Sequence, residues 1–214
     1  MKVMNFKKVL VLAPHTDDGE LGAGGFISKL VEEGAEVFYM AFSTAEESVP
    51  EGFPKDVLKT EVKAATKVLG IKEENVIIFN YQVRKLNYAR QEILEELIRF
   101  KRQESDIDLV LIPSINDIHQ DHSTIANEGI RAFKTKSIFS YELIWNNLSF
   151  NTQSYVSLDQ RHIDKKINAL KEYKSQGFRD YLSADFIRSL AVARGVQFGV
   201  QYAETFEVVR FSIK

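Results

Sequence analysis

Histidine and aspartate gather in two short clusters of the chain, and these residue types could carry metal chemistry. The first cluster reads HTDDGE over residues 15–20, and the second reads HQDH over residues 119–122. Together they hold three of the chain's four histidines, and the chain contains no cysteine. Any metal or acid–base site must therefore use histidine and carboxylate groups rather than thiolates.

Two histidines and one aspartate around an open fourth position form a typical catalytic zinc site. In such a site a metal-bound water becomes acidic enough to act as a nucleophile near neutral pH. In the first cluster His15 and Asp18 can converge on one point, and Asp17 can face the same space. Asp17, Asp121 and one histidine would then remain for proton transfer and support.

Helix capping is the structural alternative for the same residues. Aspartate and serine are common at helix N-termini. Asp17 or Asp18 could cap one helix, and Asp121 or Ser123 another. Two clusters at the ligand-binding edge of a sheet favour a site over capping alone. The fourth histidine, His162, stands in a charged segment, and we expect it to be a solvated surface residue.

The elements that must position these clusters alternate between strands and helices. Short apolar runs are typical of strands buried on both faces, and apolar residues at helical spacing indicate the helices between them. The predicted strands are 7–13, 36–42, 75–79 and 108–112, and the helices between them are 22–33, 56–69 and 89–103. Further on we expect a helix over 123–133, a strand over 137–145, a helix over 159–173, a segment around 183–194 and a final strand over 204–213.

This order predicts the fold class. Strands separated by one helix each need crossover connections, which produce a mostly parallel sheet covered on both faces. We predict a Rossmann-like, doubly wound α/β fold in a single domain spanning 1–214. Such sheets bind ligands at the carboxyl ends of their strands, and the first and fourth strands lie side by side across the switch point. The two clusters would therefore meet.

The glycines of the first helix could suggest a nucleotide site, but their spacing argues against it. Gly22, Gly24 and Gly25 do not fit GxGxxG, and no acidic residue ends the second strand. Close packing of the helix on the sheet explains these glycines better.

Composition excludes several classes of partner. The chain has 214 residues and a formal net charge of −2, so it offers no net positive field for a nucleic acid or an anionic membrane. No apolar run reaches the roughly 18–20 residues of a membrane span, and we see no secretory signal. We expect a cytoplasmic location, with homo-oligomerisation left open.

The motifs resemble the LmbE-like (PIG-L) family of zinc-dependent N-acetylglucosaminyl deacetylases. Members carry HPDD followed two residues on by a glutamate, and later HxDH; here the runs are PHTDDGELG at 14–22 and HQDH at 119–122. EVKAA at 61–65 and QYAETF at 201–206 also look like the family's pattern, so the resemblance covers roughly the whole chain.

The resemblance implies a role for each residue of the two motifs. The implied ligands of one Zn²⁺ per chain are His15, Asp18 and His122, with Asp17 as the general base. His119, oriented by Asp121, would stabilise the oxyanion, and we expect this histidine to be protonated because a neighbouring carboxylate raises the pKa of an imidazole. Zinc, iron and cobalt all remain possible metals for a His₂Asp site.

The chain departs from the family pattern where substrate would bind. Thr16 replaces the usual proline, Lys59 stands where relatives often have arginine, and Val83-Arg84 replaces an Asp-Arg pair. Lys59, Arg84 and Arg131 are our candidates for substrate binding, the two arginines for a negatively charged aglycone. Of the aromatic segment after the second motif, Tyr141, Trp145 and Asn146 could border the pocket.

The sequence thus predicts a metal-dependent hydrolase that removes the N-acetyl group from an N-acetylglucosamine-type sugar or glycoconjugate, a small-molecule substrate. One alternative is an amidase that acts on a non-sugar amide with the same residues. Another is a non-catalytic Rossmann-like ligand-binding module whose histidines and aspartates only cap helices.

Overall fold

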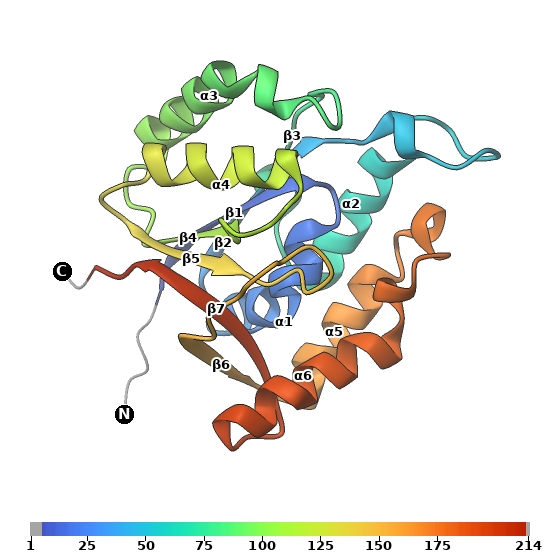
Figure 1. The fold of residues 1–214 in the computed structure, drawn as a ribbon, viewed down its shortest axis with the longest axis vertical. Helices are drawn as coiled ribbons and strands as arrows, with labels where there is room; N and C mark the ends of the chain where they lie inside the picture. The colour runs from blue at the N-terminus through green and yellow to red at the C-terminus, as the bar shows by residue number, and fades with distance from the viewer. Residues whose placement is uncertain (1–5, 213–214) are drawn as a thin grey trace.

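The computed structural model describes residues 6–212, and within this range one mixed sheet forms the centre of the molecule (Figure 1). Its order is β3-β2-β1-β4-β5-β7-β6. The seven strands are β1 (Lys8–His15), β2 (Glu36–Ser43), β3 (Val76–Ile78), β4 (Leu109–Pro113), β5 (Ser137–Tyr141), β6 (Ser154–Leu158) and β7 (Tyr202–Arg210). The first five pair in parallel, whereas β7 runs antiparallel to both β5 and β6. The doubly wound, mostly parallel α/β prediction is confirmed.

Helices cover both faces of this sheet. The α-helices of the described range are α1 (Asp18–Glu32), α2 (Val57–Leu69), α3 (Arg90–Gln103), α4 (Gln120–Ala132), α5 (Gln160–Leu170) and α6 (Ala184–Phe198). The helices α3 and α4 lie on one face, and α1, α2, α5 and α6 lie on the other (Figure 1). None of these helices is long and apolar enough to cross a membrane.

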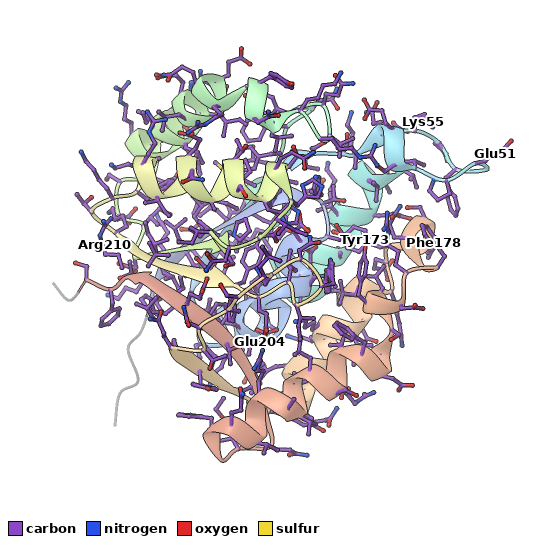
Figure 2. The ribbon with its side chains drawn as sticks, viewed as in Figure 1. Glu51, Lys55, Tyr173, Phe178, Glu204 and Arg210 are labelled. Carbon is purple, nitrogen blue, oxygen red and sulfur yellow. The ribbon has the colours of Figure 1, made fainter. Side chains whose placement is uncertain are left out.

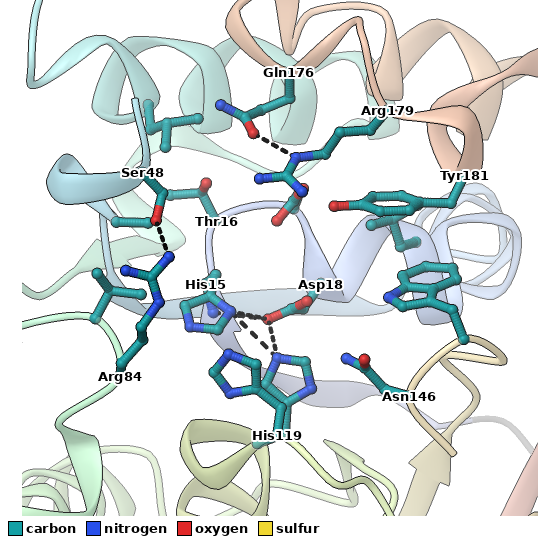
Figure 3. A pocket seen from close by; sticks show the side chains of 17 residues that line it. His15, Thr16, Asp18, Ser48, Arg84, His119, Asn146, Gln176, Arg179 and Tyr181 are labelled. Carbon is teal, nitrogen blue, oxygen red and sulfur yellow. Dashed lines mark hydrogen bonds and ion pairs between the residues drawn. The ribbon is translucent and has the colours of Figure 1, made fainter. Parts of the chain in front are cut away.

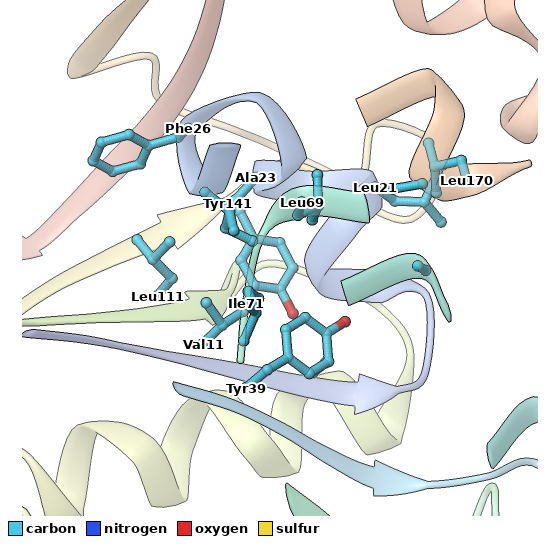
Figure 4. Packing of buried hydrophobic residues seen from close by; sticks show 14 of the residues in the cluster. Val11, Leu21, Ala23, Phe26, Tyr39, Leu69, Ile71, Leu111, Tyr141 and Leu170 are labelled. Carbon is cyan, nitrogen blue, oxygen red and sulfur yellow. The ribbon is translucent and has the colours of Figure 1, made fainter. Parts of the chain in front are cut away.

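The core forms in two parts because β1 is buried on both faces. Val9 and Val11 pack into the cluster beneath α1 and α2, while Leu10 and Leu12 pack into the cluster beneath α3 and α4. Successive side chains of a strand point to opposite faces, so a continuous apolar run feeds both layers. Figure 4 shows the first of these clusters around Val11.

The glycines of α1 bring the helix close to the sheet, as predicted. A Cβ atom on Gly22 would lie 2.2 Å from the ring of Tyr141, and one on Gly19 would lie 2.6 Å from the ring of Tyr39. These separations are far below contact distance, so any larger residue would force the helix away from the sheet.

The structure differs from the predicted elements in several places, among them the ends of the strand predicted over 137–145 and of the helix predicted over 159–173, which stop at Tyr141 and Leu170. The strand β6 was not predicted, because this short, half-exposed edge strand pairs only with β7 and lacks a buried run. The helices α1 and α4 begin at Asp18 and Gln120, earlier than residues 22 and 123. Both polar motifs therefore reach into the first helical turn. The predicted last strand ends at Arg210, and its residue 213 lies outside the described range.

His162 corrects an expectation, because it is only 2% exposed rather than solvated. Its Nδ1 accepts a hydrogen bond from the Asp159 backbone N–H at 3.0 Å, and the Asp159 side chain caps the His162 backbone in return. Its Nε2 lies 3.2 Å from a carboxylate oxygen of Glu32. This reciprocal arrangement is a capping box for α5.

Candidate active site

A pocket of about 290 Å³ opens at the carboxyl ends of the central strands, where the two polar motifs meet. The motifs meet because β1 and β4 are paired neighbours, with Val9 opposite Leu109 and Val11 opposite Leu111. Residues of both motifs line the pocket, including His15, Asp18 and His122 (Figure 3).

Three side-chain atoms in this pocket form a nearly equilateral triangle. Nδ1 of His15 lies 3.1 Å from Oδ2 of Asp18 and 3.2 Å from Nε2 of His122, and this last atom lies 3.3 Å from the same Asp18 oxygen. A tetrahedral ion with ligands at about 2.0–2.1 Å has ligand–ligand edges of about 3.3–3.4 Å. The donor set and its spacing therefore fit a zinc-like ion.

Buried carboxylates hold the far nitrogen of each of these histidines. Nε2 of His15 lies 3.0 Å from Oδ2 of Asp121, and Nδ1 of His122 lies 2.7 Å from Oδ2 of Asp117. Such outer carboxylates fix the tautomer and direct the other ring nitrogen toward a metal. The role of Asp117 was not foreseen, although its place two residues before the HQDH motif could have drawn attention to it.

The charges of this cluster are strongly coupled. Burial lowers the pKa of both His15 and His122, but the Asp18 carboxylate and the outer carboxylates outweigh it and raise the two values to about 9 and about 10. Burial acts to raise the pKa of Asp18, yet His122 and His15 hold it far below its usual range. The carboxylates around these two imidazoles therefore favour positive charge at this point, carried either by protons on the rings or by a metal ion in their place.

His119 extends the cluster but plays a different structural part from the one expected. It groups with His15 and His122, their nitrogens lying within 4.8 Å of one another, so it is a further candidate ligand. Its Nδ1 accepts a hydrogen bond from the Asp121 backbone N–H at 3.2 Å, and the imidazole thereby caps α4.

The protonated state expected for His119 is not what the structure favours. The Asp121 carboxylate contacts His15 and the backbone N–H groups of Arg84 and Leu86 instead of the His119 ring. Burial and the neighbouring basic histidines lower the pKa of His119 to about 4. An imidazole that accepts at Nδ1 is neutral and carries its proton on Nε2.

Asp17 stands beside Asp18 at the pocket surface. It occupies the N-cap position of α1, but its side chain makes no capping hydrogen bond, so this part of the capping alternative is wrong for Asp17. Burial, with the adjacent Asp18 charge, raises the pKa of its carboxyl to about 6. Asp17 can therefore exchange a proton near neutral pH.

The loop that carries these residues rests on a buried polar cluster. The hydroxyls of Tyr39 and Tyr173 lie 2.9 Å and 2.7 Å from the Thr16 carbonyl oxygen, and both contact the Glu20 carboxyl group. Burial raises the pKa of Glu20 to about 8. These bonds anchor the backbone between His15 and Asp17 from below.

Only one of the three predicted substrate-binding residues lines the pocket. Arg84 lines the pocket. Lys59 does not line it and lies 3.7 Å from Glu46, while Arg131 stands in the last turn of α4, at the far end from the motif, and pairs with Glu128. The prediction for Arg131 is wrong because a helix of this length carries its last turn well away from its N-terminus.

The three candidates from the aromatic segment after the second motif also differ in whether they reach the pocket. Trp145 and Asn146 line the pocket, whereas Tyr141 is fully buried against α1 and donates its hydroxyl to the Leu12 carbonyl. The segment between α5 and α6 adds three lining residues that the sequence did not suggest: Gln176, Arg179 and Tyr181. No local motif marks them, since only the fold brings them to the pocket.

Comparison with known proteins agrees with the motifs. The family model for PIG-L, the GlcNAc-PI de-N-acetylases, matches residues 10–133, a stretch that includes both clusters. The chain belongs to the PIG-L family.

Relatives with this PIG-L fold extend over nearly the whole chain. The diacetylchitobiose deacetylase of Thermococcus kodakarensis is 26% identical to this chain, in an alignment that covers 95% of this chain and 83% of that protein. The structure of the N,N′-diacetylchitobiose deacetylase of Pyrococcus horikoshii has a TM-score of 0.80 at 24% identity, covering 96% of this chain and 84% of that one. The structure of GalB of Pseudomonas putida, a 4-carboxy-2-hydroxymuconate hydratase, also has a TM-score of 0.80, at 19% identity, and the match covers 97% of this chain and 98% of that one. Because one fold serves both reactions, the reaction must be argued from the site.

Proposed function

We propose that this chain is a zinc-dependent hydrolase that removes the N-acetyl group from an N-acetylglucosamine-type amino sugar or glycoconjugate. The observation that carries this proposal is the triangle of donor atoms from His15, Asp18 and His122 beside the Asp17 carboxyl group. The relative named diacetylchitobiose deacetylase supports the choice of reaction.

His15, Asp18 and His122 would hold the ion, and the carboxylates of Asp121 and Asp117 would keep the two imidazoles oriented toward it. When bound, the ion supplies Lewis acidity that polarises the amide carbonyl and makes water a stronger nucleophile.

Asp17 carries the proton. Its carboxylate accepts a proton from the attacking water and then delivers that proton to the amide nitrogen, so that the C–N bond can break and the amine can leave. One water enters, and acetate and a free amine result. Its place next to Asp18 brings the base beside the nucleophile, which is the geometric requirement for general-base catalysis.

His119 stabilises the developing charge as a neutral donor. Because Nδ1 accepts from the Asp121 N–H, the proton sits on Nε2 and can be donated to the carbonyl oxygen as that oxygen becomes negative. A neutral imidazole acts in this electrophilic role in other enzymes. The general-acid role then belongs to Asp17 alone.

The pocket volume favours a small substrate. At about 290 Å³ it is at the small end of ligand sites, which commonly measure about 300–1,000 Å³. Such a space suits a single amino sugar with a compact substituent, while a larger aglycone would extend outside.

Acetate release tests the proposal. Metal-stripped protein and protein loaded with Zn²⁺, Fe²⁺ or Co²⁺ are assayed on N-acetyl hexosamines and on non-sugar N-acetyl amides. We expect metal-dependent release from the sugars. Equal activity of the stripped protein would exclude a metal enzyme. Preference for non-sugar amides would favour the amidase alternative, and no release from any amide would favour a ligand-binding module.

Two variants separate the roles of base and ligand. Asp17→Asn should keep the metal and lose activity by about 10²–10⁴-fold, the usual range for a general base, whereas His122→Ala should lose metal and activity together. Asp56→Asn is the matched control, since this exposed aspartate makes no side-chain cap at α2 and lies outside the pocket. Full activity in Asp17→Asn would refute the assignment of the base.

A further inference from the structure

A buried carboxylate on β7 has no part in the site described above. Glu207 stands between Glu204 and Arg210, the two residues of this strand that Figure 2 labels, and it is only 7% exposed. The donors that contact its carboxylate are all uncharged: the Ser114 hydroxyl at 2.6 Å, the Asn151 backbone N–H at 3.1 Å and the Asn116 side-chain amide at 3.4 Å. Burying a carboxylate without a positive partner costs free energy. Fold stability alone therefore does not account for this residue.

One oxygen of Glu207 holds the loop between β4 and α4. Its Oε2 accepts from the Ser114 hydroxyl, and the same hydroxyl oxygen accepts a hydrogen bond from the Asn116 backbone N–H at 3.1 Å. The Ser114 carbonyl in turn accepts from the Asp117 N–H at 3.2 Å. Ser114 thereby closes a turn that ends at Asp117, the residue whose carboxylate holds His122.

The other oxygen of Glu207 holds the loop between β5 and β6. Its Oε1 accepts from the Asn151 N–H, at the end of a segment that carries Trp145 and Asn146. Both of these residues line the pocket, and Figure 3 shows Asn146 at its wall. From 143 to 151 this loop contains no charged residue, so hydrogen bonds and apolar contacts must keep it in place.

The two loops are also bonded to each other. The Ile118 N–H donates to the Asn146 carbonyl at 3.1 Å, and the Leu148 N–H donates to the Asn116 carbonyl at 3.3 Å. These bonds flank a short antiparallel bridge between the loops. A displacement of one loop is therefore passed on to the other.

We propose that Glu207 is a positioning residue of the candidate active site. By holding both loops, its carboxylate keeps Asp117 against His122 and keeps Trp145 and Asn146 at the pocket wall. Glu207 does not line the pocket itself and acts only through residues that do or that hold a candidate metal ligand. The inference rests on the metal site of the proposed function and adds a residue to its support.

Ser140 provides a matched control in the same part of the sheet. It lies directly opposite Glu207 in the pairing of β5 with β7, so the two side chains lie on one face. Ser114 and Ser140 are both fully buried. The Ser140 hydroxyl makes no hydrogen bond within the described residues, whereas that of Ser114 donates to Glu207. Replacement of either serine by alanine removes one buried oxygen, but only Ser114→Ala breaks the contact with Glu207.

Zn²⁺ affinity reports on the first loop, and competition with a chromophoric chelator measures it. We expect Glu207→Ala and Ser114→Ala each to lower the affinity by about 3–10-fold, the size of one lost hydrogen bond. Glu207→Gln should lose less than about 3-fold, because its amide oxygen can accept from the Asn151 N–H while its NH₂ group donates to the Ser114 oxygen. Ser140→Ala should bind Zn²⁺ like the parent.

Trp145 reports on the second loop because it is the chain's single tryptophan. The residue is 37% exposed, and its ring stacks on Tyr181 with the ring centres 4.3 Å apart. We expect acrylamide to quench its fluorescence about 2-fold more strongly in Glu207→Ala, because release of the loop exposes the rest of the ring. Ser114→Ala keeps the Asn151 contact and should raise the quenching less.

Circular dichroism and urea unfolding establish which variants are folded. A folded Glu207→Ala protein with the parent's value in either measurement would overturn the inference, and so would changes of equal size in Ser140→Ala. His162→Ala weakens the α5 cap and controls for lower stability as such; equal changes in this variant would also count against a positioning role. If Glu207→Ala does not fold, Ser114→Ala decides, because Zn²⁺ affinity equal to that of Ser140→Ala would exclude the proposed contact.

This inference and the proposed function fail in different ways, because neither measurement uses an N-acetyl substrate. If no N-acetyl compound releases acetate but Glu207→Ala weakens Zn²⁺ binding and exposes Trp145, the proposed reaction is wrong and the role of Glu207 stands. If acetate is released and Glu207→Ala matches the parent in both measurements, the proposed function stands and the role of Glu207 is wrong.

Discussion

Replacement of Asp117 by asparagine offers a quantitative test of how the metal cluster is built. The Asp117 carboxylate accepts two hydrogen bonds, from His122 Nδ1 at 2.7 Å and from the His119 backbone N–H at 2.8 Å, and the residue is only 3% exposed. Asparagine has nearly the same shape but a single acceptor oxygen. One of the two N–H groups would therefore face an NH₂ group and lose its partner.

The expected magnitude follows from that lost bond. A hydrogen bond to a charged group contributes about 1.5–3 kcal/mol, which corresponds to roughly 10–150-fold in an equilibrium constant. Part of this loss is recovered, because the same carboxylate helps raise the pKa of His122 and so favours the proton that competes with the metal. We therefore expect Zn²⁺ affinity to fall by about 10-fold, the lower end of the range for outer-shell substitutions.

A competition titration against a chromophoric chelator at neutral pH measures this change. Circular dichroism and urea unfolding establish that the variant is folded. Asp56→Asn, at an exposed residue that does not line the pocket, controls for the loss of a carboxylate as such. A folded Asp117→Asn protein that binds Zn²⁺ as tightly as the parent would refute the reasoning.

Three further predictions follow from the geometry. His119→Ala should retain Zn²⁺ and lower kcat by about 10²–10³-fold, as expected for a lost oxyanion donor; loss of the metal on dialysis would instead make His119 a ligand. Zn²⁺ affinity should fall as pH falls below about 10 and more steeply below about 9, because His15 and His122 have raised pKa values of about 9 and about 10 and must release their protons to bind a metal; a titration showing no proton release would contradict this. His162→Ala should destabilise the protein by about 1 kcal/mol through loss of the α5 capping box, whereas His162→Gln should restore part of it; urea unfolding with equal midpoints for all three proteins would exclude this capping role.

Much of the fold could be predicted because the central strands are buried on both faces. Runs such as Val9 to Ala13 have no polar face, which identifies them as interior parallel strands. The edge strand β6 escaped prediction because its half-exposed residues resemble a loop until β7 pairs with them. Helix starts were misplaced where buried polar motif residues occupy the first turn.

The residues of the candidate metal cluster were also identifiable in advance, since cysteine is absent and three histidines stand in two short motifs. The contacts between these side chains could not be identified from the sequence. Asp121 is adjacent to His122 in the chain, yet its carboxylate holds His15, more than 100 residues away, and leaves His119 neutral. Sequence neighbours on a helix turn point in different directions, so adjacency does not predict which side chains touch.

The sequence by itself determined which chemistry is available: a site of histidine and carboxylate at the carboxyl edge of a parallel sheet, in a chain of the PIG-L family. The tertiary structure alone decided which nitrogen faces which oxygen, and which far residues complete the pocket. Arg179 illustrates this, because it reaches the site only through the packing of the segment between α5 and α6 against α2, from Glu61 through Ser175 and Gln176. Local spacing encodes the elements of a chain, whereas contacts between distant segments depend on how those elements pack together.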